Sequence, residues 1–136
     1  MSLFSFSGKR PTDIGIKDGR LKPCPGTPNC VCSQDDPSDK EHYIEPIAYS
    51  GDSKAAIDKL KTIIEGMERS TVLETTDNYL YAEFFSKLMG FGDDIEFFVD
   101  SGASVIHARA AARLGKSDLG VNRKRIEEIR SAFQAG

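Results

Sequence analysis

The sequence has no long hydrophobic run, only two histidines and three cysteines, and no strong excess of positive charge. A membrane-spanning helix needs roughly 18 consecutive apolar residues, so we expect no transmembrane segment. The first eight residues are too short and too polar for a secretory signal, which favours a cytoplasmic location. A pI near 5.4, with no known binding motif, argues against nucleic acid as a partner.

What is present fits one folding unit of 136 residues, with 39% hydrophobic and 29% charged residues. Charge is unevenly distributed along the chain. Residues 1–106 contain 11 Lys and Arg against 18 Asp and Glu, whereas residues 107–136 contain 7 against 3. This asymmetry predicts that the basic end contacts something acidic, in the same chain or in a partner.

Prolines and glycines predict that residues 1–42 form an extended arm, followed by a single α+β domain over residues 43–136. Within that domain the pattern predicts the order strand, helix, four strands, helix. The strands are expected at 44–48, 71–76, 79–85, 94–99 and 104–109, and the helices at about 52–66 and 122–133. Successive hairpins predict an antiparallel sheet of about five strands with two helices on one face.

Alternation along the strands then assigns side chains to the two faces of the sheet. One set is apolar and should face the helices: Leu80, Ala82, Phe84, Ile95, Phe97, Val99, Ile106 and Ala108. The other set mixes aromatic and ionisable groups and should form an open face: Tyr79, Tyr81, Glu83, Glu96, Phe98, His107 and Arg109. We expect this open face to be solvated, although it could also bind a partner.

Three stretches, 21–33, 90–97 and 112–126, contain the motifs LKPCPGTPNCVCS, GFGDDIEF and ARLGKSDLGVNRKRI. Together they resemble the bacterial and plastid family called domain of unknown function 1499, from about Leu21 to Arg130. The resemblance implies no activity. That family usually has serine where this chain has Cys32, and it tends to read Arg-Ser-Ala-Ser-Arg where residues 109–113 read Arg-Ala-Ala-Ala-Arg. A mechanism that needs a serine nucleophile in that segment is therefore disfavoured.

The three cysteines, Cys24, Cys30 and Cys32, lack the paired C-x-x-C spacing of zinc sites. A Cys24–Cys30 disulfide is chemically possible in an oxidising compartment. The odd number of cysteines and the missing export signal favour free, mostly buried thiols instead. We expect neither a metal nor a cofactor.

The basic segment at the start of the last helix is the strongest candidate for a site. Asn122 is a suitable N-cap, and cations in a first helical turn oppose the helix dipole unless an anion lies there. Arg109, Arg113 and Arg123 could bind that anion as a carboxylate or phosphate. Alternatively, Asp94 or Asp118 supplies the carboxylate from within the chain, an alternative that we favour.

Two neighbouring carboxylates and two isolated histidines complete the candidates. Asp93 and Asp94 should point to opposite faces of a strand, so we do not expect them to share a proton. One of them should pair with Arg113 or Arg123, or bind backbone donors. Neither His42 nor His107 is assigned a role. The sequence around Lys116 is not a P-loop, because the required upstream glycine is missing.

These observations support three hypotheses. The leading one is a non-catalytic module that binds an anionic small molecule or an acidic protein surface at the basic loop–helix junction. The second is an interaction protein, which could be a homodimer, that uses the open face around Tyr81, Phe98 and His107. The third is an enzyme with Asp94 or His107 as general base and arginines that stabilise an oxyanion.

Overall fold

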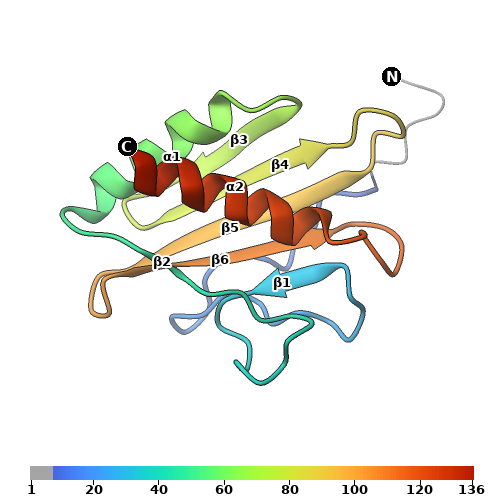
Figure 1. The fold of residues 1–136 in the computed structure, drawn as a ribbon, viewed down its shortest axis with the longest axis horizontal. Coiled ribbons are helices and arrows are strands. Elements are labelled where there is room, and N and C mark those ends of the chain that lie inside the picture. Colours follow the sequence, from blue (N-terminus) through green and yellow to red (C-terminus); the bar gives the residue numbers. More distant parts are fainter. Residues whose placement is uncertain (1–7) are drawn as a thin grey trace.

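The computed structural model describes residues 8–136. Two helices pack on one face of a six-stranded antiparallel sheet (Figure 1). In chain order the elements are β1 (Cys30–Cys32), β2 (Ile47–Ala48), α1 (Ser53–Glu65), β3 (Ser70–Thr75), β4 (Tyr79–Phe85), β5 (Gly92–Asp100), β6 (Val105–Ala112) and α2 (Val121–Ala135). The α+β class is therefore confirmed, with six strands where the sequence predicted about five.

The strands follow the order β1-β6-β5-β4-β3, and β2 also pairs with β6. The additional strand, β1, lies within the Pro-rich stretch that we expected to be an extended, loop-rich arm, and it pairs with the end of β6. At the other edge, β3 has a register shift between Val72 and Glu74. Both outer strands are thus short or irregular.

The main core lies between the helices and the sheet. Ile57, Leu60 and Ile64 project from α1, and Ile126 and Ile129 project from α2, at the three- and four-residue spacing of an amphipathic helix. They pack on the strand residues that alternation assigned to this face, all of which are buried: Leu80, Ala82, Phe84, Ile95, Phe97, Val99, Ile106 and Ala108. The predicted inner face is confirmed.

The prediction of an open opposite face is wrong. Residues 8–29, here called the covering segment, run across it on the side away from the helices (Figure 1). Leu21 is buried against Tyr79 and Tyr81, with Ile14 and Ile16 packed beside them. This second, smaller core forms because the sheet face offers aromatic rings that apolar residues of the segment remove from water.

Helix boundaries follow from local hydrogen bonds. At α1, the Asp52 carboxylate accepts a hydrogen bond from the Ala55 N–H, as an N-cap does. At α2, Asn122 is not the N-cap that we expected. Helix α2 begins at Val121, and the Asp118 carboxylate accepts hydrogen bonds from the N–H groups of Gly120 and Asn122.

Candidate functional site

A layer of charged side chains lies buried between the sheet and the covering segment. It contains Glu83 from β4, Asp94 and Glu96 from β5, Arg109 from β6 and Arg113 just beyond β6. Strand register brings them together, since Glu83 is paired with Asp94 and Glu96 with Arg109. The four strand residues are each no more than 5% exposed, so their charges must be balanced within the protein.

Arg113 joins two of the acids. Its Nε lies 2.9 Å from Asp94 Oδ2, and its Nη2 lies 2.8 Å from both Asp94 Oδ1 and Glu83 Oε1. The Tyr81 hydroxyl donates a further hydrogen bond to Asp94, and Arg10 donates to both Glu83 oxygens. The hydrogen bond to Asp94 raises the pKa of Arg113 above its already high ordinary value. This part of the layer is fully paired.

Arg109 is paired less completely. Its Nε–H donates to the Lys22 carbonyl at 2.7 Å, while its Nη1 lies 3.6 Å from Glu96 Oε1, beyond hydrogen-bonding distance. Within the described residues, neither terminal nitrogen of this guanidinium makes a hydrogen bond. Glu96 Oε1 is also buried without a hydrogen-bond partner. Arg109 therefore forms an ion pair with Glu96, while its terminal N–H groups make no hydrogen bond to the described residues.

The second Glu96 oxygen has two donors. Glu96 Oε2 accepts hydrogen bonds from the Tyr79 hydroxyl at 2.7 Å and from the Gly15 N–H at 2.8 Å. Burial, reinforced by the nearby Glu96 charge, raises the pKa of Tyr79 and keeps its hydroxyl protonated. Glu96 thus ties the covering segment to the sheet through a backbone bond.

A cavity of about 310 Å³ opens beside these groups, between the covering segment and β6. Four cationic residues line it: Lys9, Lys22, Arg109 and Arg113. Only Asp13 and Asp94 among its lining residues are acidic, and they form ion pairs with Lys22 and Arg113. The Ala111 side of β6 provides a small-residue wall. We call this hollow the cationic cavity.

The structure separates the six candidate residues into two places. Asp94, Arg109 and Arg113 line the cationic cavity, whereas Asp118 and Asn122 belong to the start of α2 in the helix layer. Arg123 donates from α2 to the carbonyls of Lys40 and Glu41.

At the loop–helix junction before α2, acidic side chains of the chain itself occupy the positions where we considered an external anion. Asp118 binds N–H groups of the first turn, and Arg125 lies 2.8 Å from the Asp93 carboxylate and stacks over the Phe84 ring. Asp93 and Asp94 thus pair with different arginines on opposite faces of the sheet, as strand geometry requires.

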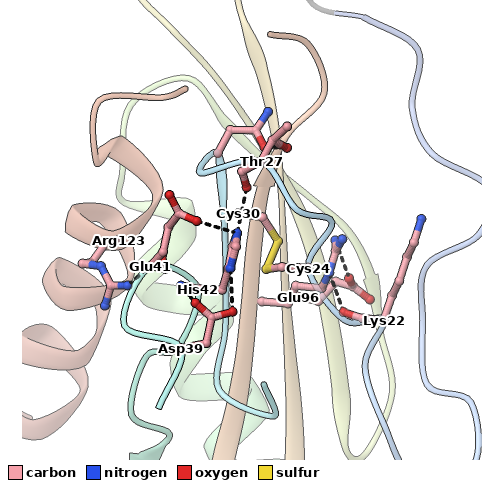
Figure 2. Close-up of a disulfide and its surroundings, with 11 residues drawn as sticks. Lys22, Cys24, Thr27, Cys30, Asp39, Glu41, His42, Glu96 and Arg123 are labelled. Atoms are coloured by element: carbon pink, nitrogen blue, oxygen red, sulfur yellow. Dashed lines mark hydrogen bonds and ion pairs between the residues drawn. A yellow bond between two sulfur atoms is a disulfide. The ribbon is translucent and has the colours of Figure 1, made fainter. Parts of the chain in front are cut away.

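The expectation of three free thiols is wrong for two of them. Cys24 and Cys30 form a disulfide (Figure 2), and their Cα atoms are 5.6 Å apart. Cys32 is free and buried. The spacing of the cysteines permits this bond, although the odd number of cysteines and the expected lack of an export signal had favoured free thiols. Burial raises the pKa of the Cys32 thiol, which keeps it unreactive.

His42 holds the disulfide loop. Its Nδ1 lies 2.7 Å from Asp39 Oδ2, and its Nε2 lies 2.9 Å from the Thr27 carbonyl oxygen, inside the loop that the disulfide closes (Figure 2). The Asp39 hydrogen bond and the Thr27 carbonyl raise the pKa of His42, because both favour the doubly protonated ring. Sequence reasoning missed this contact; the Asp39-x-x-His42 spacing was its signal.

The same place is the best metal candidate among the described residues. Asp39, Glu41 and His42 offer ligand atoms within 4.8 Å of one another. Both imidazole nitrogens already face protein acceptors, and the protonated ring that these favour has no lone pair for a cation. The donor set therefore suits a structural ion pair better than a metal.

Sequence reasoning also missed a serine–histidine pair. Ser33 Oγ lies 2.9 Å from His107 Nδ1 and accepts a hydrogen bond from the Ala108 N–H. Burial lowers the pKa of His107, which leaves its ring neutral. Ser33 is only 6% exposed, so its hydroxyl is poorly placed to attack a substrate. The pair instead joins the segment after β1 to β6.

Together, the fold and the site define an α+β domain whose second sheet face is covered by a disulfide-bonded segment above a buried charge layer. The chain belongs to the family described as "Protein of unknown function (DUF1499)", which matches residues 20–133. The resemblance seen in the three sequence motifs is thereby confirmed. No curated protein matches the chain. Among the described residues, no helix is long and apolar enough to cross a bilayer.

Proposed function

We propose that this protein is a non-catalytic module that binds a small anionic ligand, a carboxylate or a phosphate, in the cationic cavity. The observation that supports this most is Arg109. Arg109 is buried and lines the cavity, and its guanidinium forms a 3.6 Å ion pair with Glu96. Its two terminal nitrogens have no acceptor within hydrogen-bond distance among the described residues. A guanidinium fork suits the paired oxygens of such a ligand.

The surroundings favour an anion there. Lys22 and Lys9 lie on the same lining, and Lys9 forms no ion pair among the described residues. Arg113 is already occupied by Asp94 and Glu83, so we assign it a supporting role and assign direct binding to Arg109. The proposal keeps the anionic ligand expected from the sequence but moves it from the start of α2 to the opposite face of the sheet.

A binding role fits these residues better than catalysis does. Asp94 is fixed by Arg113 and Tyr81, and His107 is bonded to Ser33, so neither candidate base has a free, exposed atom paired with a nucleophile. We therefore set the enzyme hypothesis aside. The interaction hypothesis loses most of its surface, because Tyr81 is buried under the covering segment and Phe98 and His107 are only partly exposed.

The test is a titration with phosphate, sulfate, acetate and citrate at constant ionic strength, followed by thermal unfolding and calorimetry. A ligand that binds only the folded protein raises the melting temperature. Arg109→Lys keeps the charge but loses the fork, so affinity should fall about tenfold or more. Lys22→Met should weaken binding, and Lys61→Met, on the exposed surface of α1, should not. The proposal fails if no anion shifts the melting temperature, or if both lysine variants bind equally well.

The disulfide bears on location. Disulfides persist in oxidising compartments and are rare in the cytosol. We therefore propose maturation in an oxidising compartment, in place of the cytoplasm that we expected from the sequence. Thiol labelling of the protein from its native cells tests this. One reactive thiol after unfolding, from Cys32, supports the proposal, and three contradict it.

A further inference from the structure

The large apolar side chains that remain exposed in the described part of the chain gather at one end of the sheet. Leu88, Met89 and Phe91 lie on the loop between β4 and β5, and Leu114, Leu119 and Val121 lie between β6 and the first turn of α2. Leu88 is 90% exposed and Leu119 is 93% exposed. Isolated exposed leucines are ordinary, but six apolar residues on two loops form a patch.

The two loops are neighbours. Both lie at the same end of the sheet (Figure 1), and residues of each, Phe91 and Leu114 among them, line one hollow of about 190 Å³. We call this surface the loop-tip patch; it consists of Leu88, Met89, Phe91, Leu114, Leu119 and Val121. Its most exposed members stand at loop tips, away from the sheet and helices that form the core.

Local hydrogen bonds fix both tips. In the first loop, the Gly90 N–H donates to the Ser86 carbonyl and the Phe91 N–H donates to Ser86 Oγ. In the second, the Leu119 N–H donates to Ser117 Oγ, and Leu119 has φ of 56°, a left-handed backbone that a leucine rarely adopts. A well-bonded loop that holds an apolar residue in water at the expense of backbone strain suggests a functional surface.

Cations flank the patch. Lys87, Lys116 and Lys124 are exposed and form no ion pair among the described residues. The loop at 86–91 contains no acid, and the loop at 114–121 contains only Asp118, whose oxygens accept backbone hydrogen bonds. Glu68 and Glu128 lie on the side of the patch toward α1, near Val121 and Lys124. Apolar loop tips with three exposed lysines beside them are complementary to a surface with an apolar interior and anionic headgroups.

From this arrangement we infer that the loop-tip patch binds the surface of an anionic lipid bilayer, with Leu88 and Leu119 inserted among the headgroups and the three lysines at the phosphate level. Protein interfaces are depleted in lysine and are comparatively flat, so a protein partner fits this surface less well. Binding of this kind is peripheral and needs no membrane-spanning segment. The hollow beside the patch shares the lining residues Ala112 and Gly115 with the cationic cavity. No residue that one proposal assigns to its ligand is assigned to the other ligand, so the two proposals can be tested separately.

The sequence contains no tryptophan, so a single introduced tryptophan reports on its own surroundings. Leu88→Trp places a single indole at the patch, and Tyr49→Trp places one at the opposite end of the sheet, where the Tyr49 N–H bonds to Ser104. We expect vesicles of phosphatidylcholine with about one third phosphatidylglycerol to shift the emission of Leu88→Trp to the blue, with little change for Tyr49→Trp. Vesicles of phosphatidylcholine alone should shift Leu88→Trp weakly, and added salt should reduce the shift.

Sedimentation with the same vesicles separates the contribution of the apolar side chains from that of the lysines. Leu88→Ser with Leu119→Ser should reduce the bound fraction about tenfold, while circular dichroism and melting stay unchanged. Replacing Lys87, Lys116 and Lys124 by glutamine should abolish the preference for anionic lipid. The matched control replaces the exposed Lys17, Lys40 and Lys61 by glutamine, which changes net charge equally and should retain binding.

The inference is overturned if the wild-type protein does not bind the anionic vesicles, or if the two lysine variants lose binding equally. It is also overturned if Leu88→Ser with Leu119→Ser leaves vesicle binding intact. Concentration-dependent dimerisation that the same leucine variant removes, without vesicle binding, would instead assign the patch to contact between two copies of the chain.

Discussion

The Arg113 guanidinium binds both oxygens of Asp94, with Nε 2.9 Å from Oδ2 and Nη2 2.8 Å from Oδ1. The two residues are 19 positions apart in sequence, and strand pairing between β5 and β6 brings them together. Both side chains are at most 5% exposed, so the pair is shielded from water and salt. Removing one partner would leave a buried charge without its counterion.

Arg113→Ala is therefore expected to reduce the free energy of unfolding by about 3–5 kcal/mol, the usual effect of breaking a buried ion pair. Arg10 binds Glu83 as well, but its side chain is 56% exposed. Arg10→Ala should reduce the free energy of unfolding by less than about 1 kcal/mol. Urea unfolding of both variants measures the difference. Similar losses would mean that burial does not distinguish the two pairs.

Tyr79→Phe should destabilise the protein by about 1–3 kcal/mol, because Glu96 would lose one of its two donors in a fully buried place. The matched control is Tyr43→Phe, since the half-buried Tyr43 makes no side-chain hydrogen bond in the described structure. That control should change stability by less than about 0.5 kcal/mol. Equal stability of the two variants would contradict the role assigned to the Tyr79 hydroxyl.

Stability should decrease with rising pH through the titration of His42. Its pKa is raised in the folded state by the Asp39 hydrogen bond, so the ring binds its proton more tightly when folded. The resulting stabilisation is complete below the ordinary value of 6.5 and disappears as pH rises through the folded-state value. His107 has a lowered pKa and acts in the opposite direction.

The difference between wild type and His42→Gln isolates the effect, because His107 is present in both. We expect that difference to shrink as unfolding is measured from about pH 5 to pH 9. A difference independent of pH would mean that the His42 contacts with Asp39 and Thr27 do not depend on the proton.

Reducing the disulfide should lower the free energy of unfolding by about 2 kcal/mol, the chain-entropy value for a short loop. Its two cysteines are six positions apart. Cys24→Ser with Cys30→Ser should have the same effect, and reductant should then change nothing further. Because Thr27 lies within that loop and receives the His42 bond, the double variant should also weaken the pH effect of His42. Unaltered stability in reductant would contradict this prediction.

The helix-facing half of the fold could be predicted because its signal is periodic. Leu80, Ile95, Phe97 and Ile106 alternate along their strands, and the spacing from Ile57 to Ile64 gives a helical face. Strand pairing was predictable too, since short turns leave antiparallel hairpins as the only arrangement. Such patterns depend on the neighbouring residues alone.

The covering segment has no such period. Ile14, Ile16 and Leu21 contact Tyr79 and Tyr81 more than 50 positions away, and turns rather than a regular element set their directions. The start of α2 was mispredicted for a similar reason: we expected the Asn122 side chain to cap the helix, and the Asp118 carboxylate accepts those hydrogen bonds instead. Both residues are good caps by composition, and only the left-handed backbone at Leu119 and Gly120 directs the Asp118 carboxylate back to the helix.

Of the candidate site, residue identities were predictable but their grouping was not. The sequence identified Arg109, Arg113 and Asp94 as candidates, and it predicted that Asp93 or Asp94 pairs with an arginine. The cavity they line requires Lys9 and Lys22, which the covering segment delivers from far along the chain. Single-sequence reasoning has no access to that contact.

The edges of the sheet have a consequence for behaviour at high concentration. Unpaired backbone along a long, regular outer strand invites neighbouring molecules to add strands and grow into fibrils. Here β1 has three residues and β3 is interrupted by its register shift, so neither offers a continuous template. Short and interrupted outer strands therefore protect the molecule from forming fibrils by strand addition at the sheet edges.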